Sequence, residues 1–123
     1  MRKEIFVQGE YYHLYNRGVD KRVIFSHETD KIRFVNTIYV LNNFQDIPAR
    51  FDIVRMRPKE LLVSREPMVA IAAGALMPNH YHIVARPLSD GGISKLFHKV
   101  GVSYTMYFNK RNGRSGALFE STF

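Results

Sequence analysis

Two histidines separated by a single residue, His80 and His82, are the pair whose type and spacing suggest chemistry. If this segment is an extended strand, its side chains alternate between two faces. Both imidazoles then project from the same face, about 7 Å apart at the backbone. Two imidazoles can converge on one cation through bonds of about 2.0 to 2.2 Å and leave positions open for water or phosphate oxygens. The pair therefore indicates a site for Mg²⁺ or Mn²⁺. The alternative interpretation is two histidines that are hydrogen-bonded on a sheet face, because they would give the same sequence pattern.

Other side chains are candidates to surround this pair. In the segment Tyr11–Arg17, alternation places His13, Tyr15 and Arg17 on one face, so His13 is a candidate to line the site. Glu120 is the one acid after Asp90 and is a candidate to approach the ion. For both, an ordinary surface role is the alternative interpretation.

The charge of the chain is unevenly distributed. Eighteen Lys and Arg residues against eleven Asp and Glu give a net charge of +7. No acid occurs between residues 91 and 119, which favours a polyanionic partner, with a solvated helix face as the alternative. The candidate DNA contacts are Arg17, Lys21, Arg22, Lys95, Lys99, Lys110 and Arg111.

Length and composition exclude several classes of protein. A chain of 123 residues leaves room for one domain, spanning residues 1–123, and its 46% hydrophobic content is that of a globular protein. With no cysteine, a disulfide framework, a zinc–thiolate site and a thiol nucleophile are excluded. No segment has the length of a signal peptide core or a membrane span, so we expect a cytoplasmic protein.

Hydrophobic periodicity predicts the elements that must position these residues. We expect a strand over residues 11–17, a helix capped by Ser26 with the stripe Phe34, Val35, Ile38 and Tyr39, and an irregular stretch over 44–67 with one short strand near 51–56. The apolar run 68–77 favours a central strand buried on both faces. A strand over 80–86 and a helix over 93–109 follow. The helix stripe is Ile93, Leu96, Phe97, Val100, Tyr104, Tyr107 and Phe108.

This order of elements, with a further strand at 117–122, is typical of a ferredoxin-like α+β sandwich. Both helices would cover one face of an antiparallel sheet. The other face would then hold the metal and DNA site.

The residues around the histidine pair resemble a known family. Met77-Pro78-Asn79-His80-Tyr81-His82 is similar to the His-hydrophobic-His metal motif of the single-tyrosine HUH transposases, found in insertion sequences of the 200/605 type and in REP-associated transposases. Residues 12–19 through 24–25 resemble that family's first strand and the loop after it. Residues 104–109 and 116–119 resemble the helix and turn beyond the HUH strand. Residues 44–67 carry no part of the resemblance.

The resemblance implies a transposase domain that cleaves and rejoins single-stranded DNA, often beside a hairpin, and that works as a homodimer. In that family a tyrosine hydroxyl attacks a DNA phosphate, which forms a 5′-phosphotyrosine link and frees a 3′-OH. The histidine pair holds a divalent ion that orients and neutralises the phosphate.

The chain departs from the family pattern at the nucleophile. The family's tyrosine lies on a later helix, in a stretch that does not occur before Phe123, and that helix can also supply a third metal ligand. We therefore expect a domain that cannot cleave DNA alone. Tyr104 and Tyr107 are weak candidates to replace the nucleophile, since the apolar stripe that they share favours packing in the core. The alternative function is a non-catalytic module of ferredoxin-like fold that binds single-stranded nucleic acid without metal, and a purely structural domain is a third possibility.

Overall fold

A computed structural model describes residues 6–43 and 66–121. Its elements are strand β1 (Tyr12–Arg17), a short 3₁₀ turn at Val19–Lys21, helix α1 (Glu28–Leu41), strands β2 (Val69–Met77) and β3 (His80–Pro87), and helix α3 (Gly92–Asn112). The expected irregular stretch and the strand near 51–56 lie almost wholly outside the described residues. The three strands form an antiparallel sheet in the order β1-β3-β2.

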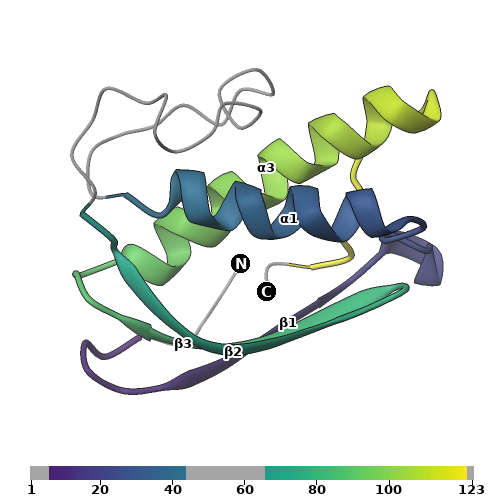
Figure 1. The fold of residues 1–123 in the computed structure, drawn as a ribbon. Helices are drawn as coiled ribbons and strands as arrows, with labels where there is room; N and C mark the ends of the chain where they lie inside the picture. Colours follow the sequence, from purple (N-terminus) through teal and green to yellow (C-terminus); the bar gives the residue numbers. More distant parts are fainter. Residues whose placement is uncertain (1–5, 44–65, 122–123) are drawn as a thin grey trace.

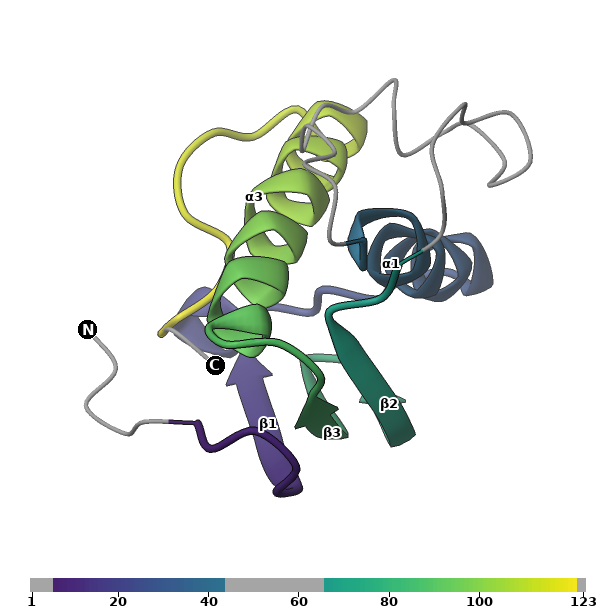
Figure 2. The same ribbon diagram turned by 90° about the vertical axis from the view of Figure 1, so that its left-hand side faces the viewer.

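Both helices cover the same face of the sheet, which leaves the other face without a helix (Figures 1 and 2). We call this second face the open face. The architecture confirms the expected α+β class. No helix of the described residues is both long and apolar enough to span a bilayer.

The core lies between the sheet and the helices because alternate strand residues point toward them. Leu14 of β1 and Tyr81, Ile83 and Ala85 of β3 are buried there. The stripe expected on the second helix is confirmed, since all seven of its residues are buried. The stripe expected on the first helix is only half right: Phe34 and Ile38 are buried, but Val35 and Tyr39 are exposed.

The apolar run 68–77 was expected to be a central strand buried on both faces, and this is wrong. In the described sheet β3 is central and β2 lies at an edge, with exposed residues along most of its length. The run is rich in alanine, which is apolar enough to resemble a core strand in a sequence but too small to demand burial. A register shift between Ile71 and Ala73 bends this edge strand.

Two further boundaries differ from expectation. The first helix begins after His27 instead of Ser26, because the Asp30 carboxylate accepts hydrogen bonds from the backbone N–H groups of both Ser26 and His27. The strand expected at 117–122 is reduced, within residues 117–121, to an isolated antiparallel bridge between Phe119 and Gly18. The expected strand is therefore not formed within the described residues 117–121, and the ferredoxin-like topology stays a prediction.

Candidate metal site on the open face of the sheet

The register of the sheet places the histidine pair on the open face. His82 lies opposite Tyr15 and His80 lies opposite Arg17, on the central strand β3 and its neighbour β1. Because Tyr81 between the two histidines is buried in the core, His80 and His82 both point to the opposite side. The prediction that the two imidazoles share one face is confirmed.

Three imidazoles gather there. His13 is exposed, its Nε2 lies 2.8 Å from Nδ1 of His82, and the two rings stack with their centroids 4.9 Å apart. The centroid of His80 lies 5.1 Å from that of His82, with the rings at right angles. His82 is therefore the middle ring of a row formed by His13, His82 and His80, which we call the histidine row. The alternation of the first strand made His13 a candidate, but only the strand register could pair it with His82.

His80 has a fixed hydrogen-bond partner. Its Nδ1 lies 2.8 Å from the side-chain oxygen of Asn79, the residue before it. An amide oxygen only accepts, so Nδ1 of His80 carries the proton and Nε2 keeps its lone pair. Asn79 thus prepares His80 to bind a cation through Nε2, a role that the sequence analysis did not assign to it.

The imidazole nitrogens of His80 and His82 are suitable ligands for a divalent ion, but the side chains do not form a complete coordination site. Among residues 6–43 and 66–121, no three His, Cys, Asp or Glu side chains are arranged to hold a metal ion. Two imidazoles on one face, one with its lone pair oriented, meet the requirement for a two-histidine site with open positions. The site would therefore form by turning the half-buried rings of His80 and His82, with the strands as a fixed base.

The surroundings of His82 favour its neutral form. Its pKa lies below the ordinary value of 6.5, mainly because neighbouring atoms desolvate the ring and also because His13 and His80 stand beside it. A metal ligand has to be the neutral imidazole. The crowding that lowers the pKa of His82 thus also makes its ring available to a cation.

Of the tyrosines, Tyr15 lies against the histidine row. Its ring centroid is 5.0 Å from that of His82 and 5.7 Å from that of His80, and its side chain is 38% exposed. Tyr104 and Tyr107 lie on α3, across the sheet. The Tyr104 hydroxyl donates to the Ile24 carbonyl and the Tyr107 hydroxyl donates to Asp30, both in the buried interior. Burial raises the pKa of both phenols, so these two tyrosines are packing residues with engaged hydroxyls.

Arg17 and Glu120 meet at the edge of the open face. The guanidinium of Arg17 makes two hydrogen bonds to the Glu120 carboxylate, at 2.9 and 3.2 Å, and these bonds raise the pKa of Arg17. The neighbouring Asn16 side chain holds the backbone of Ser121. In the structure Glu120 thus pairs with Arg17 and is not grouped with the histidines as a metal ligand. The segment that carries Glu120 is held against the end of β1.

The candidate basic residues divide into two groups. Lys21 and Arg22 are exposed in the loop after β1, and hydrogen bonds from Gly18 to Asn79 and from Ile24 to Pro78 hold this loop against the turn that leads into His80. The other candidates, Lys95, Lys99, Lys110 and Arg111, belong to α3 on the covered face (Figure 2). Arg111 also contacts the Tyr107 hydroxyl and the buried Asp30. The structure brings the loop residues near the histidine row but not those of α3.

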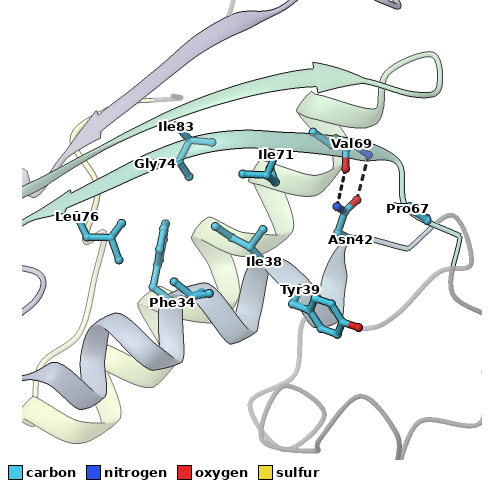
Figure 3. Close-up of a pocket in the computed structure, with 11 residues that line it drawn as sticks. Phe34, Ile38, Tyr39, Asn42, Pro67, Val69, Ile71, Gly74, Leu76 and Ile83 are labelled. Atoms are coloured by element: carbon cyan, nitrogen blue, oxygen red, sulfur yellow. Dashed lines mark hydrogen bonds between the residues drawn. The ribbon is translucent and has the colours of Figure 1, made fainter.

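An apolar pocket lies elsewhere, between α1 and β2 on the covered side of the sheet (Figure 3). Its lining includes Phe34, Ile38, Leu76 and Ile83, which face the core side. Asn42 closes one end of it by hydrogen bonds to the backbone of β2. The pocket is separated from the histidine row by the sheet itself and holds none of the candidate site residues.

Comparisons with known proteins return no match: no protein-family model fits the chain, and no curated protein or solved structure is significantly similar to it.

Proposed function

We propose that this chain is the metal- and DNA-binding domain of a transposase that cleaves and rejoins single-stranded DNA. The observation that supports it best is the placement of His80 and His82 side by side on an open sheet face, with Asn79 orienting one ring. A divalent ion bound there, Mg²⁺ or Mn²⁺, would neutralise a phosphate and stabilise charge on the leaving oxygen. The resemblance to the single-tyrosine HUH transposases adds the reaction type.

The residues around the histidine row have separate tasks in this proposal. Lys21 and Arg22 bind the phosphate backbone as it passes the turn before His80. Tyr15 offers an exposed ring on which a base can stack beside the histidines. Arg17 binds phosphate only after its guanidinium exchanges the Glu120 carboxylate for the DNA.

In the family that the chain resembles, strand cleavage needs a tyrosine hydroxyl carried by a helix beyond the histidine pair. Its attack on phosphorus would form a 5′-phosphotyrosine bond, break the bond from phosphorus to the 3′ oxygen, and leave a 3′-OH once that oxygen takes up a proton. Tyr104 and Tyr107 are held on the other side of the sheet. We therefore propose that cleavage requires a further helix that carries the tyrosine. In an experiment, this helix can be added as a second polypeptide. The homodimer and the hairpin beside the cleaved strand rest on the resemblance.

The proposal is tested by DNA binding with and without metal. We expect a fluorescein-labelled single strand of random sequence to bind the full chain more tightly in Mn²⁺ than in EDTA, as measured by fluorescence anisotropy. The double variant H80A/H82A should lose this metal dependence, while His98→Ala, on the exposed surface of α3, should keep it. A wild-type chain that binds the strand equally well in EDTA would contradict the proposal.

That contrary result would favour the second candidate function, a single-strand-binding module that needs no metal. One observation supports this alternative: Tyr11, just before β1, and Tyr15, within β1, are exposed aromatic side chains that would give stacking surfaces without any ion. In that case, replacing Tyr15 with alanine would weaken binding in EDTA, whereas H80A/H82A would not.

A further inference from the structure

We propose that Arg86 and Tyr11 form a second contact site for single-stranded DNA, at the end of the open face away from His80. At this second contact site the guanidinium of Arg86 binds a phosphate and the ring of Tyr11 stacks on a base. The inference rests on the proposed function, because that function supplies the single strand that crosses the open face. Charge patterning did not select Arg86 as a DNA contact.

Arg86 projects from the same face of the sheet as the histidine row. It lies four residues after His82 on β3, and Ala85 and Pro87 on either side of it are buried. Because side chains alternate along a strand, Arg86 and His82 point to the face that carries no helix (Figure 2). At about 3.3 Å per residue the two positions lie about 13 Å apart. A stacked strand that rises about 3.4 Å per nucleotide covers this distance with about four nucleotides.

The charge of Arg86 is not neutralised by another described side chain. Its Nε is buried without a hydrogen-bond partner, and no ion pair joins Arg86 to an acid within residues 6–43 and 66–121. At the other end of the open face, in contrast, Arg17 is paired with Glu120. A guanidinium forms charge-assisted hydrogen bonds with phosphate, so Arg86 is available to an anion that reaches the open face.

Tyr11 supplies an aromatic surface beside this cation. The guanidinium carbon of Arg86 lies 5.5 Å from the centroid of the Tyr11 ring, in a cation–π contact. Tyr11 is nevertheless 59% exposed, which leaves part of its surface for a ligand. Unpaired bases stack on aromatic rings and on guanidinium planes. The pair therefore offers the two kinds of contact that hold a nucleotide of a single strand.

The charge of the sheet favours a polyanion as the occupant of this face. None of the three described strands contains an aspartate or a glutamate. A nucleic acid strand that runs from the histidine row to Arg86 would therefore meet no acidic strand residue on its path. This complementarity favours a single strand of DNA over an acidic peptide-binding role or an apolar partner.

A fluorescent reporter at Tyr11 tests the base contact. The chain contains no tryptophan, so Tyr11→Trp introduces a single indole at the second contact site. In Mn²⁺ we expect a thymidine oligomer of about eight nucleotides to quench its fluorescence, because a base stacks on the indole. Tyr39→Trp is the matched control, since Tyr39 is also exposed but belongs to α1 on the covered side, and its indole should not be quenched.

The salt dependence of binding tests the phosphate contact. Arg86→Gln should lower the slope of log affinity against log salt by about 0.7, whereas Arg86→Lys keeps the charge and should keep the slope. Arg33→Gln is the matched control, because Arg33 also lies over a tyrosine ring, that of Tyr107 at 4.8 Å, but on α1. This control should have the slope of the wild type. Anisotropy titrations with the same oligomer would measure all four slopes.

The contrary outcomes distinguish this inference from the proposed function. If the oligomer binds but the indole of Tyr11→Trp is not quenched, the second contact site is wrong and the proposed function stands. An Arg86→Gln slope equal to that of Arg33→Gln would also overturn the second contact site alone. A wild-type chain that binds no oligomer in either Mn²⁺ or EDTA would overturn both.

Discussion

At the scale of single residues, the two faces of one sheet give their side chains different environments. On the open face, His82 is crowded by two other imidazoles, and His80 is oriented by Asn79. On the covered face, Tyr104 and Tyr107 use their hydroxyls to complete the core. Alternation along a strand is a reliable guide to such a division, because successive side chains must point to opposite faces. What alternation cannot supply is the partner strand, so the contact between His13 and His82 required the register.

The crowding of His82 has a measurable consequence in the absence of metal. Desolvation, His13 and His80 together lower its pKa, so its ring should stay neutral as the pH falls below 6.5 and take up its proton only in more acid solution. Replacing His13 with phenylalanine should move the titration back toward the ordinary value. Ring resonances followed by NMR against pH in EDTA would check this. A midpoint for wild-type His82 at or above 6.5 would contradict it.

The assignment of Tyr104 to the core predicts a loss of stability without a loss of binding. In Tyr104→Phe the buried carbonyl of Ile24 loses its donor, which should lower the free energy of unfolding by about 1 to 2 kcal/mol. Urea denaturation would measure this, with Tyr11→Phe as the control because the Tyr11 side chain is 59% exposed. If Tyr104→Phe instead abolished DNA binding or cleavage while leaving stability unchanged, its placement in the core would be wrong.

At the scale of elements, the sequence predicts the buried face of a helix better than the position of a strand within the sheet. The stripe of α3 could be read directly, since seven residues at helical spacing leave one consistent buried face. The position of β2 could not be read, because an alanine-rich run is compatible with either a central or an edge strand. The cap of α1 was missed by one residue, since Asp30 reaches back to two backbone N–H groups.

The end of α1 is tied to the start of β2 by one buried side chain. Asn42 accepts hydrogen bonds from the N–H groups of Met68 and Val69 and donates one to the carbonyl of Val69. Figure 3 shows the bonds to Val69. Asn42→Ala would leave these buried groups without their partner, so we expect unfolding free energy to fall by about 3 kcal/mol. Chemical denaturation would measure it, and the exposed Ile32→Ala should change stability by no more than about 0.5 kcal/mol. Equal effects of the two substitutions would contradict this role for Asn42.

At the scale of the whole molecule, net charge is a poor guide to the binding surface. The chain carries +7, and its longest stretch without acids includes α3. Yet α3 packs on the covered face, whereas the loop with Lys21 and Arg22 lies against the turn beside His80. The sequence predicted both groups as DNA contacts because charge patterning carries no information on which face of the fold a residue occupies.

The two groups can be separated by the salt dependence of single-strand binding. Each phosphate contact contributes about 0.7 to the slope of log affinity against log salt, so K21A/R22A should reduce the slope by about 1.4. K95A/K99A removes the same charge from α3 and should leave the slope nearly unchanged. Anisotropy titrations over a range of salt concentrations would measure both. The same decrease for the two double variants would show that the strand does not run along the open face.

A calorimetric titration of Mn²⁺ into the full chain tests whether His80 and His82 hold a divalent cation. We expect saturable binding to one site in the wild type and in His98→Ala, and loss of this binding in H80A/H82A, whose circular dichroism spectrum should show an intact fold. Unchanged Mn²⁺ binding in the folded double variant, or none in the wild type, would contradict it.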